Sequence, residues 1–145
     1  MPTSTHTDVK ARLTELCEEF RTGGLDCRVE LDGRHLAFDD EVAEIIYRTV
    51  RELLTNVRQH ARAKHVTLSS TRRRDGGVAV TVADDGIGLP PERRRGNPFD
   101  ETGGIGLWSI DQRLRELDAV LDIDAAKGQG TRATVVLPAD LLNGD

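Results

Sequence analysis

Three polar residues interrupt the apolar side of a predicted helix in this 145-residue chain. Apolar side chains recur at helical spacing between Val42 and Val57, yet Asn56 and His60 fall among them and Glu52 falls at their edge. Leaving such a group buried without a partner would cost roughly 1–3 kcal/mol. A lone asparagine is often satisfied by neighbouring backbone, so the helix pattern alone leaves a structural and a functional interpretation open.

A second candidate is a loop of acids and glycines with the sequence Asp84-Asp85-Gly86-Ile87-Gly88. It follows an alternating apolar segment, so we expect it at the end of a strand. Glycine permits positive φ and lets a ligand approach the backbone closely. Together with Asn56, this loop predicts a nucleotide site in which the polar edge of the helix packs against the end of the strand.

Two further glycine loops, 103–106 and 128–130, flank the predicted C-terminal elements. At the first of them, free backbone N–H groups of a helix start can bind phosphate oxygens. The chain has no Gly-x-x-x-x-Gly-Lys-Ser/Thr pattern, and Ser109 occupies the place of the third glycine of a dinucleotide fold. Both of these common phosphate motifs are therefore excluded, and each loop on its own is more simply a turn.

Composition and charge limit the classes of function. The formal net charge of −5 argues against a general nucleic-acid partner. The two cysteines, Cys17 and Cys27, form no metal-like cluster and fit a reducing, cytoplasmic setting. No stretch approaches the roughly 18 apolar residues of a membrane helix. We therefore expect no direct membrane contact by this chain, although a full-length protein could carry an anchor elsewhere.

The remaining patterns predict the helices, strands and loops that hold these residues in place. A helix from Val9 stops at Gly23-Gly24, and a second helix, capped by Asp40, spans 40–61. The other expected elements are a strand at 27–31, hairpins at 66–82 and 120–137, a mobile loop at 89–102 and a helix at 105–117. This order predicts an α+β two-layer sandwich, with helices packed on one face of a mixed β-sheet.

The length predicts one domain, which we divide into three parts. Residues 1–38 are expected to form an accessory helix and strand, and residues 139–145 a C-terminal tail. Residues 39–138 contain every candidate site residue and are expected to form the core.

The combination of these motifs is more specific than any one of them. Four patterns resemble the ATP-binding site of the GHKL ATPases, which share the Bergerat fold: Glu52-x-x-x-Asn56-x-x-x-His60, Asp84-x-Gly86-x-Gly88, Gly104-x-Gly106-Leu107 and Gly130-Thr131. Residues 52–61 look like the catalytic domain of sensor histidine kinases that pair with NarL-like response regulators. The resemblance covers about residues 40–138.

The resemblance implies ATP and Mg²⁺ as cofactors and gives roles by position. Asp84 would accept a hydrogen bond from the adenine amino group, which selects adenine because the guanine carbonyl offers no donor there. Gly86 and Gly88 would let the chain pass close to the base. Asn56 would be a ligand of Mg²⁺ through its side-chain oxygen.

The same resemblance implies how the phosphates are held. The helix start formed by Gly104, Ile105, Gly106 and Leu107 would bind them through its backbone N–H groups. The 89–102 loop would be a lid over ATP. Thr131 would help to close the pocket.

Two roles stay open, and two positions depart from the family pattern. Glu52 is either catalytic or a structural, metal-shell residue, and His60 either contacts phosphate or fills a core position. Gln59 stands where such kinases often carry a basic residue. Asp118-Ala119 replaces their usual paired glycines.

The leading interpretation is the ATP-binding catalytic domain of a two-component sensor histidine kinase. None of the four histidines (His6, His35, His60 and His65) shows an acceptor pattern, so we expect the acceptor histidine on a separate helical dimerisation domain. The expected partners are that domain, in a homodimeric full-length protein, and a NarL-type response regulator. The alternatives are a stand-alone anti-sigma-factor-type serine kinase and a non-catalytic, ATP-dependent interaction module.

Overall fold

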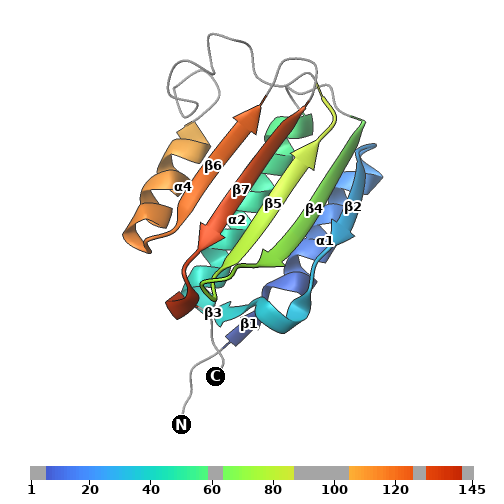
Figure 1. Cartoon of the computed structure of the whole chain (residues 1–145). Helices are drawn as coiled ribbons and strands as arrows, with labels where there is room; N and C mark the ends of the chain where they lie inside the picture. The colour runs from blue at the N-terminus through green and yellow to red at the C-terminus, as the bar shows by residue number, and fades with distance from the viewer. Residues whose placement is uncertain (1–5, 59–63, 87–104, 126–129, 142–145) are drawn as a thin grey trace.

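A computed structural model describes residues 6–58, 64–86, 105–125 and 130–141 of the chain. It has two layers, with helices on one face of a five-stranded sheet (Figure 1). The helices are α1 (Val9–Thr22), α2 (Asp40–Asn56) and α4 (Ile105–Glu116). The strands of the sheet are β2 (Asp26–Glu30), β4 (His65–Arg72), β5 (Val78–Asp84), β7 (Thr131–Leu137) and β6 (Val120–Ala125), in that spatial order.

This arrangement confirms the predicted mixed sheet with helices on one face. β2 pairs with β4 in parallel, whereas β4, β5, β7 and β6 pair antiparallel in succession. Two short strands, β1 (His6–Asp8) and β3 (Ala37–Asp39), form a separate antiparallel pair that the sequence analysis did not predict. Three residues are too few to show an alternating pattern. Short 3-10 turns occupy Gly33–His35 and Ala139–Leu141.

Helix α2 is the central element of the helical layer. Its apolar side is buried against the sheet and the neighbouring helices, as the helical spacing predicted; the buried residues are Val42, Ala43, Ile45, Ile46, Thr49, Val50, Leu53 and Leu54. The predicted cap was wrong by one residue, because Asp39 Oδ1 accepts from the Val42 N–H at 3.0 Å and Asp40 begins the helix. The α-helix ends at Asn56, and residues 59–61 of the predicted helix lie outside the described residues.

The C-terminal ends of α1 and α4 have the same hydrogen-bond pattern. At α1, Gly24 N–H donates to Arg21 O and Leu25 N–H donates to Phe20 O, each at 3.0 Å. At α4, Asp118 and Ala119 take the places of Gly24 and Leu25. Asp118 therefore adopts a positive φ of 59°, in a position where α1 uses glycine at 102°. The departure from paired glycines thus places an L-residue in a strained conformation.

Asp118→Gly is expected to raise the free energy of unfolding by about 0.5–1 kcal/mol. Glycine removes the Cβ strain of the left-handed conformation, and its greater freedom in the unfolded chain offsets part of the gain. Urea unfolding measures the change. Gly24→Ala is the matched control and should lower stability by about 1 kcal/mol. An Asp118→Gly protein less stable than wild type would contradict this account of the turn.

Candidate nucleotide-binding site

The candidate residues gather at one end of the sheet. The C-terminal end of α2, the end of β5, the start of β7 and the start of α4 all lie at the upper end of the molecule in Figure 1. Asn56 is the last residue of α2, and Asp84 is the last residue of β5. Thr131 begins β7 and lies directly opposite Asp84 in the sheet. The fold thus unites three motifs that are far apart in the sequence.

Several of the predicted site residues lie outside the part of the chain that the structure describes. His60, Gly88, Gly104, Gln59 and the 89–102 loop are outside the described residues. The backbone of Ile105, Gly106 and Leu107 forms the first turn of α4, as predicted, but their side chains are likewise outside the described part. Their roles remain predictions.

Asp84 is held rigidly at the end of β5. Its Oδ1 accepts a hydrogen bond from the Gly86 N–H at 2.7 Å, and Gly86 is itself buried. Burial raises the pKa of the Asp84 carboxyl above its ordinary value, while the N–H groups of Gly86 and Thr131 act in the opposite direction. The side chain is a half-buried acceptor placed beside the backbone of β7.

Gly130 makes the close approach between β7 and Asp84 possible. Its φ is +83°, and a Cβ at this position would lie 2.0 Å from the carbonyl oxygen of Asp84 and 3.2 Å from Cα of Asp85. No side chain can fit against backbone at that distance. The role of Gly130 could not be predicted from its motif, because the collision depends on the β5–β7 pairing.

Gly130→Ala should destabilise the protein by at least about 2 kcal/mol and should displace Asp84. The added methyl group collides with backbone, and the positive φ adds strain. Thermal unfolding and ATP titration measure the two effects. Gly76→Ala is the control, because Gly76 also has a positive φ (+92°) but its Cβ would meet only the Ala139 side chain, at 3.2 Å. Equal losses in the two variants would rule out a specific role of Gly130.

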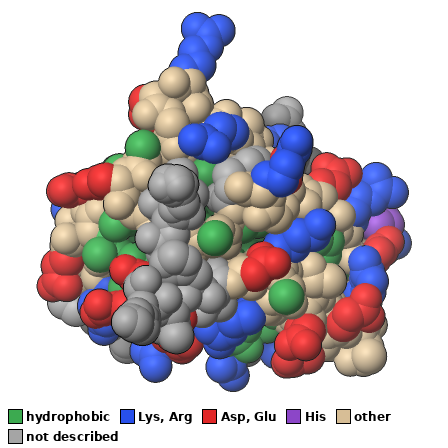
Figure 2. Space-filling view, turned by 90° about the horizontal axis from the view of Figure 1, so that it is seen from below, with side chains coloured by type: hydrophobic (Ala, Val, Ile, Leu, Met, Phe, Trp, Pro, Cys, Tyr) green, Lys and Arg blue, Asp and Glu red, His purple; other side chains and the backbone are tan. Residues whose placement is uncertain are grey.

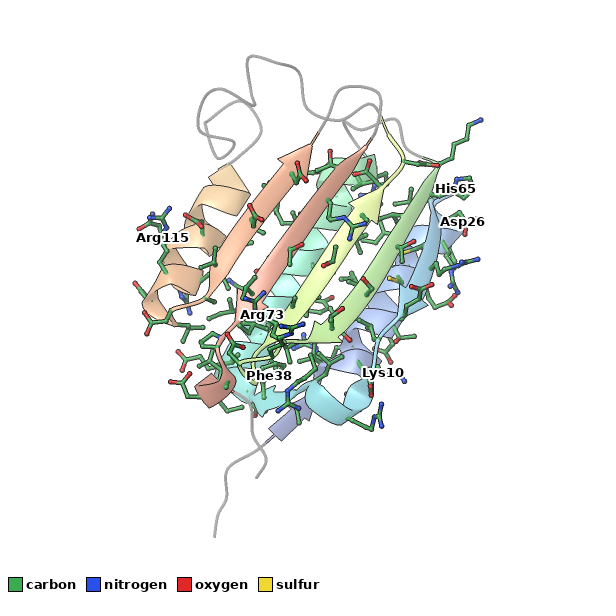
Figure 3. All side chains as sticks on the ribbon, viewed as in Figure 1. Lys10, Asp26, Phe38, His65, Arg73 and Arg115 are labelled. Atoms are coloured by element: carbon green, nitrogen blue, oxygen red, sulfur yellow. The ribbon has the colours of Figure 1, made fainter. Side chains whose placement is uncertain are left out.

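Asp85 joins the loop after β5 to the start of β4. Its Oδ1 accepts from the N–H groups of Lys64 and His65, each at 3.0 Å, and its Oδ2 is 2.7 Å from His65 Nδ1. The Asp85 N–H donates in return to His65 O at 3.2 Å. Figure 3 shows His65, at the start of β4, beside Asp26, at the start of the edge strand β2. Oδ2 of Asp26 is 3.5 Å from Nε2 of His65. We call these bonds of Asp85 the Asp85 clip.

The clip was missed by the sequence analysis, which treated Asp85 only as the middle residue of a motif. The two acids of Asp84-Asp85-Gly86 have opposite surroundings: Asp84 is half-buried, whereas Asp85 is exposed and surrounded by donors. Hydrogen bonds from the backbone and side chain of His65 lower the pKa of Asp85 to about 2. The clip fixes the strand end that carries Asp84, so Asp85 is a positioning residue.

Asp85→Ala is expected to lower stability by about 1–2 kcal/mol at pH 7, after allowance for solvent screening of an exposed group. The folded-state pKa of Asp85 lies below the ordinary value of 3.8. Its contribution is therefore complete above about pH 4 and disappears as pH falls toward 2. Urea unfolding of wild type and variant across this range tests the claim. A stability difference that stays constant down to pH 2 would contradict it.

Asn56 and Glu52 lie one turn apart at the end of α2, and both are half-buried. Within the part of the chain that the structure describes, no hydrogen bond joins either side chain to another residue. An uncharged amide oxygen such as that of Asn56 is a ligand type that Mg²⁺ accepts, because Mg²⁺ takes few protein ligands and completes its octahedron with phosphate and water oxygens.

Two hollows elsewhere do not coincide with these residues. One, of about 280 Å³, lies between the first half of α2 and α4 and is lined by Glu41, Glu44, Ile45, Arg48, Ile110 and Arg113. The other contains Asp32 and Arg34, which form an ion pair with each other. The lower end of the molecule shows interspersed acidic and basic side chains with scattered apolar ones (Figure 2). Neither hollow includes Asn56 or Asp84.

Comparison with known proteins shows the family of the chain. Residues 41–141 match the family described as histidine kinase-, DNA gyrase B-, and HSP90-like ATPases. The chain belongs to this ATPase family. The matched range contains Asn56, Asp84 and Thr131, and the ATP-binding interpretation of the domain is confirmed.

Several members of this family that resemble the chain are sensor histidine kinases. Sensor histidine kinase YdfH of Bacillus subtilis is 31% identical over 132 residues, which is 90% of this chain and 31% of YdfH. Nitrate/nitrite sensor protein NarQ of Escherichia coli is 29% identical over 77% of this chain and 18% of its own length. The histidine kinase domain of a blue-light activated kinase from Erythrobacter litoralis superposes with a TM-score of 0.78 and 25% identity, over 97% of this chain and 66% of that one.

These relatives confirm the resemblance to sensor histidine kinases and do not favour the serine kinase or the non-catalytic module. The chain spans about a third or less of the length of the curated relatives YdfH and NarQ. Among the described residues, no helix is long and apolar enough to cross a membrane.

Proposed function

We propose that this chain binds Mg·ATP and transfers the γ-phosphoryl group to a histidine on a separate helical dimerisation domain. The observation that carries the proposal is that α2 ends with Asn56 at the same end of the molecule at which Asp84 ends β5 and pairs with Thr131 of β7 (Figure 1). The relatives that share the sequence and fold are named as sensor histidine kinases, which favours a histidine acceptor over a serine.

Asp84 supplies base recognition in this proposal. Its carboxylate accepts a hydrogen bond from the adenine amino group, while the Gly86 N–H donates to Oδ1 and holds the carboxylate in place. The half-buried carboxylate strengthens the bond because water competes less well there. A guanine base would present a carbonyl oxygen to this carboxylate, and the resulting repulsion would exclude it.

Asn56 would hold Mg²⁺ through its side-chain oxygen. Charge neutralisation of the phosphate oxygens is the chemistry that Mg²⁺ provides when bound. The backbone N–H groups at the start of α4 hold phosphate oxygens, in keeping with the positive end of a helix. The site thus acts mainly by positioning ATP for in-line attack.

The remaining roles are those that the family resemblance implies. Glu52, one turn before Asn56, would order the water around the metal or accept a proton from the attacking histidine. His60 would contact phosphate or fill a core position, Gly88 would let the chain pass close to the base, and the 89–102 loop would be a lid over ATP. The full-length protein is a cytoplasmic homodimer that passes its phosphoryl group to a response regulator of the NarL type.

The chemistry of the phosphorylated residue tests the proposed function. Full-length native protein is incubated with γ-labelled ATP and Mg²⁺, and the labelled protein is treated with acid or alkali. Phosphohistidine loses the label in acid and keeps it in alkali, which is the expected result. Label that survives acid would identify a serine kinase. Absence of label would favour the non-catalytic, ATP-dependent interaction module. Either of these two results would overturn the histidine assignment.

A further inference from the structure

The two cysteines meet in the core although they are on different elements. Cys17 lies on α1 and Cys27 on β2, and both side chains are fully buried at 0% exposure. Their Sγ atoms are 2.8 Å apart and share a hydrogen bond. Sequence analysis found no cluster here, because the contact depends on α1 folding back onto β2 after the Gly23-Gly24 turn.

We propose that Cys17 and Cys27 form a dithiol site that a hydroperoxide oxidises to an intramolecular disulfide. A disulfide bond is about 2.05 Å long. The two sulfurs must therefore approach by less than about 1 Å, which side-chain rotation can supply. The nucleotide-site residues named above do not include either cysteine, so this modification site is distinct from the proposed ATP site.

The two thiols are not equivalent. The hydrogen bond to Cys17 lowers the pKa of Cys27. The positive charge of Arg21 also lowers this pKa, whereas burial raises it. Arg21 is held there by a 2.7 Å hydrogen bond from its Nε to Cys27 O. The hydrogen bond to Cys27, together with burial, raises the pKa of Cys17. Because the thiolate is the nucleophile, Cys27 reacts first.

The oxidation balances in two steps. The Cys27 thiolate attacks one oxygen of hydrogen peroxide, the O–O bond breaks, and the released hydroxide takes up the proton that Cys27 lost, giving water and a sulfenic acid. The sulfur of Cys17 then attacks the Cys27 sulfur, the S–O bond breaks, and the Cys17 proton leaves with that oxygen as a second water. Two thiols lose two electrons to one peroxide.

Access is through the edge of the sheet. β2 is a terminal strand that pairs only with β4 within the described sheet, and it follows the Gly23-Gly24 turn directly (Figure 1). Brief separation of this short edge strand from α1 admits a molecule as small as hydrogen peroxide. Glutathione disulfide is far larger, so we expect it to react much more slowly.

Peptide mapping tests the disulfide in the wild-type protein. Native protein is treated with hydrogen peroxide, remaining thiols are alkylated, and the chain is digested with trypsin without reduction. Cleavage after Arg12, Arg21 and Arg28 separates the cysteines into peptides 13–21 and 22–28. We expect these peptides to be joined, and to separate after treatment with dithiothreitol. Two fully alkylated peptides, or cysteines oxidised singly, would overturn the proposal.

Limited alkylation of the wild-type protein tests which sulfur reacts first, because both thiols and their hydrogen bond stay in place. Native protein is treated briefly with substoichiometric iodoacetamide, and the modified cysteine is located in peptides 13–21 and 22–28 after tryptic digestion. Cys27 is expected to carry at least about tenfold more adduct than Cys17, because the thiolate is the reactive form. Equal labelling, or the reverse order, would contradict the assignment of Cys27 as nucleophile.

Discussion

Asn56→Ala is expected to abolish the Mg²⁺ dependence of ATP binding and to reduce phosphoryl transfer by roughly 100-fold or more. The variant removes the side-chain oxygen at the last position of α2, whereas alanine is a good helix residue and leaves the fold intact. Calorimetric titration of ATP with and without Mg²⁺ measures the effect.

Thr55→Ala is the matched control for Asn56. Thr55 is the neighbouring residue, but its Oγ1 donates to Arg51 O at 2.8 Å, within the helix. We expect this variant to keep Mg²⁺-linked affinity. An Asn56→Ala protein whose ATP affinity still rises with Mg²⁺ as in wild type would refute the metal role.

Asp84→Asn is expected to weaken ATP binding by roughly 10- to 100-fold, the equivalent of about 1.5–3 kcal/mol for a hydrogen bond to a charged group. An amide of the same shape keeps one acceptor oxygen for the Gly86 N–H but loses the charge that attracts the adenine amino group. Titration calorimetry measures the affinity. Unchanged binding would contradict the adenine-recognition role of Asp84.

The same variant should not lower stability at neutral pH. Burial raises the folded-state pKa of Asp84, so the ionised carboxyl is less stable in the folded than in the unfolded chain. The penalty is absent below the unfolded-state pKa and appears as pH rises through the folded-state pKa. Asp84→Asn removes this penalty, and unfolding in urea at pH 7 should show equal or greater stability. A marked loss of stability would indicate misfolding rather than loss of recognition.

The periodic elements could be predicted because each carries its own signal. The helices α1, α2 and α4 and both hairpins follow helical or alternating spacing, with glycine at the turns. Local chemistry was harder to place: two adjacent acids compete for the start of α2, and only the geometry shows that Asp39 makes the cap. β1 and β3 were missed because strands of three residues carry no period.

The elements that carry Asn56 and Asp84 could be predicted, because the helix and the strand each follow their own spacing; the roles of the two residues stay predictions. Features that depend on tertiary contact could not be predicted. Asp85 is fixed by donors from the start of β4, and Gly130 is required because β7 passes against Asp84. The pairing of Cys17 with Cys27 depends likewise on packing of α1 against an edge strand. Such contacts join residues that are far apart in the sequence, and no local sequence pattern predicts them.

In the proposed function, Asp84 selects adenine at the end of the sheet where Asn56 would hold Mg²⁺. Titration of the protein with ATP and with GTP, each in Mg²⁺, tests this selection. ATP is expected to bind at least about tenfold more tightly than GTP, and Asp84→Asn should remove most of that difference. Equal affinity of the wild-type protein for the two nucleotides would contradict the account.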